Sequence, residues 1–577
     1  MAVSRSGEAG VAAGDTADAD RARLHQLGYK QELKRGLSLM SNFAFSFSII
    51  SVMAGVTTTY NGGLRYGGPA SMTLGWLVVA AFNGCVALSM AEICSAYPTS
   101  GGLYYWSAKL AGKKWAPLAS WVTGWFNIVG QWATTTSTDF SLAQLVQVIV
   151  LLGTGGANGG GYLASKYVVL AIHAFFLVLH GLINSLPIRW LSWFGKLGAF
   201  WNTAGAFTLV ILIPTVAKER ASAKFIFTHF NDDNGMGIHG KAYILALGLL
   251  TSQYSLLGYD TSAHMIEETK NADWSGPMGI ITSVALSTTF GWIFLVALTS
   301  IVTDIPYLLD PANDAGGYAV AQALYTAFDR RYGSGVGGLV CVAMVAVGIF
   351  FAGAMCIASN SRFGHQSQHP FLELLALNNI TILYTRKSKD GVRLLEGQGD
   401  AILARVATGE QERGASQRRL ALRRRRLHNG SHGAQRFPHG ARNTQTLDVH
   451  SLSLRFSFLY VQSLGSQVAF QAMVSISTLG QYIAYALPIF FRVTTSRKSF
   501  VPGPFHLGRY GVFVGWAAVL WVAFLTVLFS LPVAYPVAQE TFNYTPVAVG
   551  GVLLLSLAAW VFSARFWFKG PITNVDS

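Results

Sequence analysis

Long apolar segments alternate with short polar ones along most of the chain. A stretch of roughly 20 apolar residues is long enough to cross a bilayer as a helix. Eleven such windows occur, near 41–62, 70–94, 117–152, 166–187, 193–217, 242–266, 279–302, 335–358, 474–494, 511–533 and 547–566. The third window is unusually long, and we expect an interfacial turn within it. The pattern predicts an all-α polytopic membrane protein.

The positions of lysine and arginine predict the direction of these helices. Cations gather in every second short loop, and such loops face the cytosol. They are Lys30, Lys34, Arg35, Lys109, Lys113, Lys114, Arg189, Lys270 and Arg362. The intervening loops have fewer cations, and the glycine-rich loop 153–161 has none. We therefore expect the N-terminus in the cytosol, with residues 1–38 as a cytosolic tail.

The alternation fails after the eighth window. If 474–494 is the ninth helix, then Arg492, Arg497 and Lys498 fall outside the cell. One further helix between residues 363 and 473 would return these cations to the cytosol. The charge pattern thus asks for an additional helix in a segment that is rich in arginine.

Composition supports the membrane assignment. Of 577 residues, 51% are hydrophobic and only 12% are charged, with a mean hydropathy of +0.39. Soluble domains carry about a quarter charged residues. The four cysteines (Cys85, Cys94, Cys341 and Cys356) lie in or beside apolar windows without metal-ligand spacing. We expect buried thiols, no metal site and no cofactor, and we predict a protein that is not an enzyme.

Basic charge is concentrated in one segment. The net charge is +15, and residues 363–460 hold 15 Lys and Arg against 7 Asp and Glu, a local net charge of +8. This segment includes the row Arg423–Arg426. Because the excess is local, it does not predict a nucleic-acid-binding protein.

The first window contains residues that favour an interrupted helix. Gly55 is followed by Val56 and Thr57 within SIISVMAGVTTTYNGG (48–63). Glycine and β-branched residues are weak helix formers. An unwound helix in a bilayer is tolerated where it lines a buried site, and its free N–H groups suit a substrate carboxylate. The alternative is an ordinary helix whose threonine hydroxyls bond to the preceding turn.

The window at 242–266 carries a second interruption. Gly258 is followed closely by Asp260, and a carboxylate inside the membrane is a functional candidate. Alternatively, Asp260 is structural and bonds to neighbouring hydroxyls. His264, Glu267 and Glu268 lie further on, where we expect gate or interface residues. Two interrupted helices five windows apart match an inverted five-helix repeat.

Other polar residues in the windows have plainer interpretations. We expect Asp139, His173 and His180 to pair across helices in a structural role. Lys196 could replace a coupling cation, but it lies where a side chain would extend to the membrane interface. The stretch GSGVGG (333–338) lacks a βαβ context and is not a dinucleotide motif.

Several stretches resemble one transporter family. The segment after the second window reads AEICSAYPTSGGLYYWSAKLAGKKWAPLASWVTGWFN (91–127) and is similar to the signature of amino acid–polyamine–organocation transporters. The GYDTSAHMIEET run and VPGPFHLGRYG resemble plant bidirectional amino-acid transporters, of the amino acid/choline, GABA permease-like branch. The resemblance covers about 25–362 and 463–573. It implies twelve transmembrane helices with a five-plus-five inverted repeat.

The resemblance also implies a substrate site at the two interruptions. The residues are Met53, Ala54, Gly55, Val56, Thr57, Tyr254, Ser255, Gly258 and Tyr259. Implied gating or coupling residues are Tyr254, Asp260, Glu267 and Glu268. Many relatives have Gly-Ser-Gly where this chain has Met53-Ala54-Gly55, so backbone groups would have to bind the substrate carboxylate.

Residues 363–462 depart from the family, which has a cytosolic loop and its ninth helix there. With permitted codons, the adjacent reading frame of 407–433 encodes a loop followed by an apolar helix. We therefore interpret 363–462 as exon read out of frame, then intron. A genuine insert that binds anionic lipid is the alternative. The resulting division is a tail at 1–38, spans one to eight at 39–362, this segment, spans ten to twelve at 463–568, and a tail at 569–577.

The functional prediction is a secondary transporter that moves amino acids, GABA among them, across the plasma membrane or an internal membrane. Its expected partners are an amino-acid substrate, the lipid bilayer and a co-transported proton or sodium ion. A choline or polyamine carrier is one alternative, because a cationic substrate would rely on Asp260. A transport-inactive paralogue that acts as a sensor or scaffold is the other.

Overall fold

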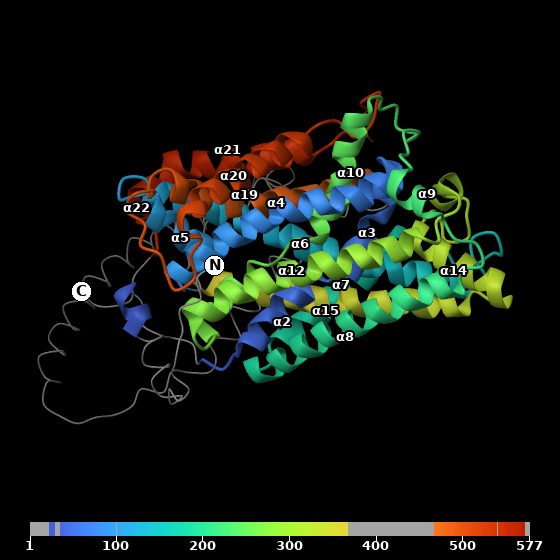
Figure 1. Cartoon of the computed structure of the whole chain (residues 1–577), viewed down its shortest axis with the longest axis horizontal. Coiled ribbons are helices and arrows are strands. Elements are labelled where there is room, and N and C mark those ends of the chain that lie inside the picture. The colour runs from blue at the N-terminus through green and yellow to red at the C-terminus, as the bar shows by residue number, and fades with distance from the viewer. Residues whose placement is uncertain (1–21, 29–34, 100, 367–466, 539–540, 572–577) are drawn as a thin grey trace, which may run out of the picture. The chain divides into compact units, whose positions relative to one another are not determined.

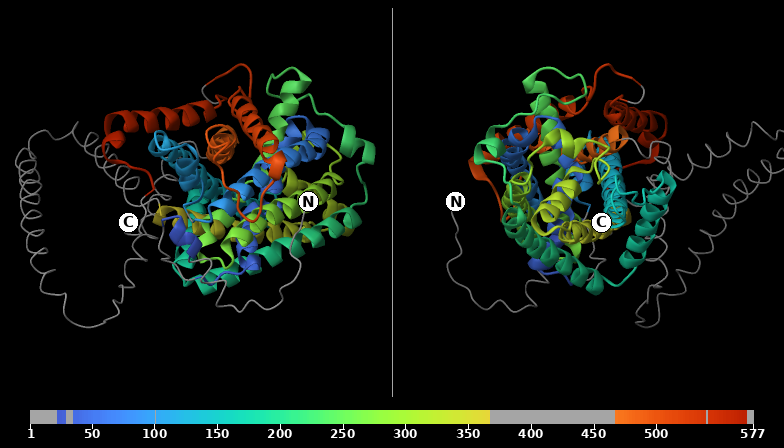
Figure 2. Two further views of the ribbon diagram at one scale, coloured as in Figure 1. Left: turned by 60° about the vertical axis from the view of Figure 1, so that its left-hand side comes forward. Right: turned by 90° about the vertical axis from the view of Figure 1, so that its right-hand side faces the viewer.

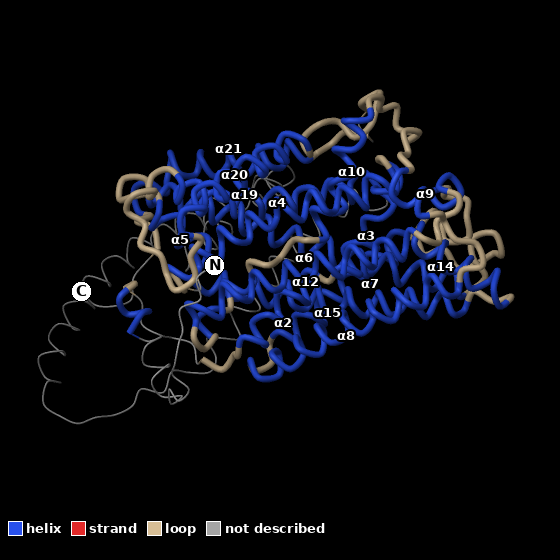
Figure 3. Tube along the Cα trace, viewed as in Figure 1, coloured by secondary structure: helices blue, strands red, loops and turns tan. Residues whose placement is uncertain are grey.

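A computed structural model describes residues 22–28, 35–99, 101–366, 467–538 and 541–571, and these fold into packed helices (Figure 1). They belong to one compact unit of residues 1–367 and 445–577, while 368–444 lies outside the described residues. The predictions for 363–462 lie outside them too, apart from the helix end at 363–366. The described part contains isolated bridges but no β-sheet (Figure 3).

The order of the helices follows the apolar windows. The first half contains α2 (Leu39–Ile50), α3 (Val52–Arg65), α4 (Gly68–Ala96), α5 (Gly102–Leu110), α6 (Ala116–Gly153), α7 (Lys166–Asn184), α8 (Ile188–Val216) and α9 (Ala223–Thr228). Next come α10 (Lys241–Ser255), α11 (Thr261–His264), η1 (Ile266–Glu268), α12 (Ala272–Thr299), α13 (Ile305–Leu309), α14 (Ala319–Tyr332) and α15 (Val336–Gln366). The last are α19 (Gln467–Val493), η3 (Gly508–Tyr510), α20 (Gly511–Leu528), α21 (Thr545–Ala559), η4 (Trp560–Ala564) and α22 (Arg565–Trp567).

Ten helices in the described residues are long and apolar enough to cross a membrane, with 39–65 counted as one despite its break. The one predicted window that is not among these ten is 242–266. It is divided between α10 and α11, and neither helix alone is long enough to cross a membrane. The division reflects the second predicted interruption, because the residues between α10 and α11 are unwound.

The predicted turn in 117–152 is wrong, because α6 is one helix of 38 residues. At 1.5 Å per residue it extends about 57 Å, which exceeds a hydrocarbon core of about 30 Å. Its length is used for packing, since α6 contacts α5, α7, α15, α19 and α21. Figure 2 shows these helices from two further directions.

The helix ends gather into two groups. At one end, Arg35 donates to the Thr269 carbonyl (2.7 Å), and Ser95 donates to the Asp273 carbonyl (2.8 Å). At the other end, Gly67 pairs with Asn231, and the amide of Asn61 donates to the Gly317 carbonyl (2.6 Å). The cationic loops before α2, after α4 and after α11 therefore share one end, as their charge predicts.

Candidate functional site

The first window is interrupted at Ser51. Helix α2 ends at Ile50 and α3 begins at Val52, and Ser51 has a φ of 24°, which is unusual for a residue other than glycine. Its hydroxyl donates to Asn202 Oδ1 on α8 at 2.6 Å. This contact with a distant helix stabilises the unusual conformation.

The sequence placed this interruption four residues too late. Gly55 lies inside α3, where its N–H donates to the Ser51 carbonyl at 3.0 Å. Thr59 donates to the Gly55 carbonyl at 2.8 Å, so the alternative of a hydroxyl bonded to the preceding turn holds for this threonine. Weak helix formers predicted a break in the correct helix, but the tertiary contact of Ser51 determines where it falls.

The second interruption lies where the sequence predicted it. Helix α10 ends at Ser255, and residues 256–260 are unwound before α11 begins at Thr261. Gly258 has a φ of +104°, a conformation that side-chain-bearing residues rarely adopt. The Thr261 hydroxyl donates to the Gly258 carbonyl at 2.9 Å, which satisfies one carbonyl of the unwound segment.

The two interrupted helices touch through their glycines. A Cβ atom on Gly55 would lie 2.7 Å from the Cα atom of Ser255, closer than real Cβ contacts. A Cβ atom on Gly258 would collide with the side chain of Ile49 at the end of α2. Each glycine therefore allows its own helix to approach the other one.

A small cavity lies at this contact. It provides about 30 Å³ of water-accessible space, and roughly 10–15 Å³ accommodates one water. An amino acid would therefore require its walls to move apart. The lining residues are Ile49, Ile50, Ala54, Gly55, Thr58, Thr134, Thr138, Tyr254, Leu257, Ile349 and Ala352.

The cavity contains only part of the predicted substrate set. Ala54, Gly55 and Tyr254 line it. Met53, Val56, Thr57, Ser255, Gly258 and Tyr259 are buried around it without lining it.

 

Four cavity residues carry no signal in the sequence. Thr134 and Thr138 come from α6, and Ile349 and Ala352 come from α15. Small and apolar residues of these kinds occur throughout membrane helices. Only the packing of α6 and α15 against the interrupted helices brings them to the cavity.

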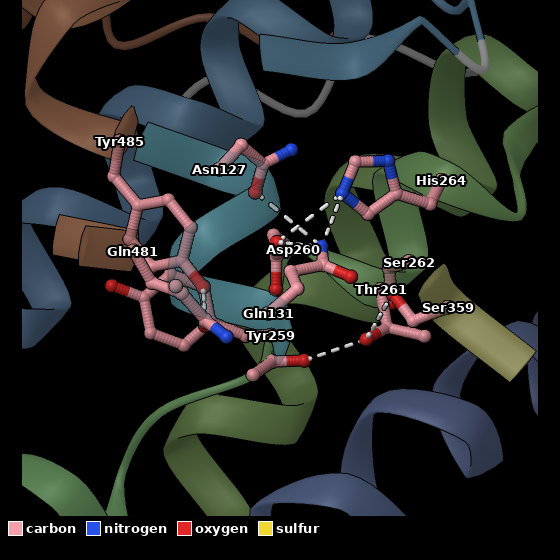
Figure 4. Close-up of polar contacts among 12 residues, drawn as sticks. Asn127, Gln131, Tyr259, Asp260, Thr261, Ser262, His264, Ser359, Gln481 and Tyr485 are labelled. Atoms are coloured by element: carbon pink, nitrogen blue, oxygen red, sulfur yellow. Dashed lines mark hydrogen bonds and ion pairs between the residues drawn. The ribbon is translucent and has the colours of Figure 1, made fainter. Parts of the chain in front are cut away.

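Asp260 lies in a buried polar cluster next to the second interruption (Figure 4). Its Oδ2 atom accepts from Gln131 Nε2 on α6 at 3.1 Å and lies 3.2 Å from His264 Nε2. The side chains of Asp260 and His264 are nearly or fully inaccessible. The predicted alternative, bonds to neighbouring hydroxyls, differs from this arrangement, because Gln131 belongs to α6 and His264 lies one turn further along the chain.

The remaining gate candidates occupy two depths. The Tyr254 hydroxyl lies 2.9 Å from the Ser137 hydroxyl on α6, beside the cavity. Glu267 and Glu268 are buried in η1, at the end of the molecule that holds the cationic loops. There the Glu268 carbonyl accepts from the N–H of Leu37 at 2.8 Å. Tyr254 is therefore near the cavity, and the two glutamates are distant from it.

Asp139 and His180 form the cross-helix pair that the sequence predicted. Asp139 Oδ1 on α6 lies 3.0 Å from His180 Nδ1 on α7, and both side chains are fully buried. Lys196 is exposed on α8, in agreement with a side chain that extends to the interface. All four cysteines are free, with Cys85 half-buried and the others buried.

A second buried ion pair lies near the cationic loops. Arg492 Nη2 at the end of α19 is 3.5 Å from Glu92 Oε2 on α4. The guanidinium also stacks over the ring of Phe500. Glu92 Oε1 accepts from the N–H of Leu507 at 3.1 Å. This pair joins α4, α19 and the loop that follows α19.

The chain matches the model of a known family over most of its length. The model describes amino acid permeases and matches residues 37–366 and 451–554. The chain is a member of the amino acid permease family. The match omits 367–450, which covers most of the segment that departs from the resemblance.

Plant permeases are similar to this permease from end to end. It is 56% identical to the amino-acid permease BAT1 homolog of Oryza sativa subsp. japonica over 100% of both chains. It is 53% identical to amino-acid permease BAT1 of Arabidopsis thaliana, covering 97% of this chain and 98% of the relative. The GABA-specific permease of Saccharomyces cerevisiae is 26% identical over 96% of this chain and 86% of its own. The predicted resemblance to plant bidirectional amino-acid transporters is confirmed.

A solved transporter structure has the same fold. The crystal structure of MhsT in complex with L-phenylalanine aligns with a TM-score of 0.54 at 12% identity, over 86% of this chain and 99% of that one. The fold prediction of an all-α inverted-repeat transporter is confirmed. Together with the family, it makes this permease an integral multi-pass membrane protein and a secondary amino-acid transporter.

Proposed function

We propose that this permease binds its amino acid between the two interrupted helices and moves it by alternating access. The first N–H groups of a helix have no partner within it and carry a partial positive charge. At the start of α3 these belong to residues 52–54, which include Met53 and Ala54 of the predicted set. The substrate carboxylate would bind there, and Gly55 and Val56 follow in the same turn.

The substrate amine would bind at the other interruption. The last carbonyls of α10 lack helical partners and carry a partial negative charge. Ser255 ends α10, and Tyr254 and Leu257 line the cavity beside it. The observation on which the proposal rests is the contact of Gly55 with Ser255, because it brings a positive and a negative helix end to one cavity.

Asp260 is proposed as a gate residue. It lies in the unwound part of the second interrupted helix and is bonded to Gln131 on the continuous helix α6. When the interrupted helices move relative to α6, this contact has to break and form again. Glu267 and Glu268 are proposed to act further along, at the cytosolic entrance, and the N-terminus is proposed to be cytosolic.

The coupled ion is proposed to be a proton, with sodium as the alternative. Both carboxylates near the middle of the described spans, Asp139 and Asp260, lie beside an imidazole. Acid–imidazole pairs change charge by taking up or releasing a proton.

Radiolabelled uptake in a permease-deficient yeast tests the proposed function. The chain with the family's ninth helix restored is expressed beside the chain that carries residues 363–462 as they stand, and amino acids, GABA and choline are offered in turn. Uptake of amino acids or GABA supports the proposal. Uptake of choline alone would favour the alternative carrier. No uptake despite correct membrane insertion would favour a sensor or scaffold. GABA is included because one yeast relative is a GABA-specific permease.

We also propose that the transcript encodes a further helix between α15 and α19. Near the end of α15, Ser359 contacts Thr261 on α11, which leads into η1 at the end that holds the cationic loops, and Asn360 contacts Thr135 on α6. Helix α19 starts at the opposite end, where Gln471 and Tyr66 line one pocket, and it ends beside Glu92. Helices placed in this way need a crossing between them. Sequencing the transcript tests the proposal, and reads that encode Arg423–Arg426 in the present frame would contradict it.

A further inference from the structure

The pair formed by Asp139 and His180 stands apart from the proposed gate. It joins α6 to α7, whereas the Asp260 cluster joins α6 to the unwound segment. On α6, Asp139 follows Gln131 by eight residues, or about 12 Å along the helix axis. Thr134 and Thr138 line the cavity between these two positions. The cavity therefore has one acid–imidazole pair towards each end of the same stretch of α6.

The pair lies directly behind the cavity wall. Asp139 follows the lining residue Thr138, and Gly353 on α15 follows the lining residue Ala352. A Cβ atom on Gly353 would lie 2.7 Å from His180 Cε1 and would also collide with Asp139. The backbone of α15 is thus in contact with the pair. Any change in the separation of Asp139 and His180 acts on the cavity wall one residue away.

Anchoring of α7 does not explain these side chains. The buried stripe of α7 consists of His173, Leu177, His180, Gly181 and Asn184. Asn184 already joins α7 to α15, because its amide donates to the Ala354 carbonyl at 2.8 Å. Apolar side chains would suffice for the rest of this stripe. Ionisable residues inside a membrane are costly and are found where they act on ions or substrates.

The charge of the pair depends on a single proton. With one proton shared between the carboxylate and the imidazole, the pair has no net charge. Without it, an uncompensated carboxylate remains in a fully buried position. Asp139 Oδ1 and His180 Nδ1 approach to 3.0 Å without hydrogen-bond geometry, and the remaining side-chain oxygen and nitrogen of the pair also lack hydrogen-bond partners among the described residues, so no neighbouring donor there would stabilise that carboxylate. The titratable side chains that face the pair are His173 on α7, Cys356 on α15 and Tyr254 on α10.

We propose that the Asp139–His180 pair, behind the wall of the cavity between the two interrupted helices, binds the proton whose movement drives amino-acid transport. The proposal rests on the proposed function. In each transport cycle one proton binds to the pair from the outside and is released to the cytosol. The permease then returns to its outward-facing state without a proton on the pair. Loss of the proton changes the contact between the pair and Gly353, and thereby the shape of the cavity. Asp260 keeps the separate role of a gate.

Purified protein in proteoliposomes tests the proposal by two measurements. The first is exchange of labelled for unlabelled amino acid without a pH gradient, which needs the substrate site and both gates. The second is accumulation driven by an acidic exterior, which also needs the coupled proton. Asp139→Asn keeps the size of the side chain and removes the charge. We expect this variant to exchange and to lose the accumulation driven by the gradient.

Two comparison variants make the result specific. Asp232→Asn is the same chemical change at an exposed carboxylate, and it should leave both measurements at the native level. His180→Gln keeps a polar group beside Asp139 and should shift the pH at which uptake is half-maximal. A pair that only holds α7 in place would leave that pH unchanged in every variant that still transports.

Three results would overturn the proton site. One is accumulation by Asp139→Asn that equals the native level. Another is loss of both exchange and accumulation in Asp139→Asn while His180→Gln keeps the native pH profile. The third is native protein that exchanges amino acid but does not respond to the pH gradient, which leaves the proposed function intact. Native protein without any exchange would overturn the proposed function and the proton site with it.

Discussion

Replacing Gly55 by alanine tests the contact on which the proposed substrate site depends. The new Cβ atom would lie 2.7 Å from Ser255 Cα and 2.9 Å from both Cβ and Oγ of that serine. Carbon atoms in contact settle at about 3.5–4.0 Å. The two helices would therefore have to separate by about 0.8–1.3 Å, because the nearest atom belongs to the backbone and cannot rotate away.

The expected cost follows from this displacement. Extra methyl groups in a packed interior cost about 1–3 kcal/mol, which corresponds to about 5- to 150-fold in an equilibrium. Because the strain falls between the proposed carboxylate and amine sites, we expect kcat/KM for amino-acid uptake to fall by about that factor. Uptake is measured in the permease-deficient yeast together with the amount of protein at the membrane.

The chain offers a matched control for this substitution. Gly84 on α4 has no heavy atom within 4 Å of a Cβ built on it, so Gly84→Ala should transport like the native protein. Ser255→Gly in the Gly55→Ala background removes two of the three close contacts and should restore part of the uptake. Native uptake by Gly55→Ala, at native abundance, would refute the reasoning.

Three further outcomes follow from the same geometry. Gly258→Ala should lower uptake, because a residue with a side chain pays about 1–3 kcal/mol to adopt a φ of +104°. Adding Ile49→Ala removes the steric contact and should restore only part of the uptake, so full recovery in the double variant would contradict a backbone cause. Asp260→Asn should reduce exchange and uptake alike across a wide pH range, and unchanged flux over that range would exclude a role in transport. Glu92→Gln leaves the largely buried Arg492 without its carboxylate and should destabilise the protein by roughly 3–5 kcal/mol. The change is measured as a lower thermal midpoint in detergent, and a native midpoint would argue against a stabilising pair.

The sequence alone determined which helices cross the membrane and which two are interrupted. These features depend on residues that are neighbours in the sequence. They are the length of each apolar window, the placement of Lys and Arg, and the residue types around Gly55 and Gly258. The plant transporter resemblance was available from short motifs as well. The predicted pairing of Asp139 with His180 was also correct, because a charge inside the membrane requires a partner.

Tertiary structure decided the details of the site. The break falls at Ser51 because Asn202, some 150 residues later, accepts its hydroxyl hydrogen bond. Asp260 accepts a hydrogen bond from Gln131 rather than from an adjacent hydroxyl, because α6 passes beside the unwound segment. The need for glycine at position 55 comes from the backbone at Ser255, and four of the eleven residues that line the cavity come from α6 and α15. Contacts between residues this distant in the chain leave no local pattern, so only the folded structure reveals them.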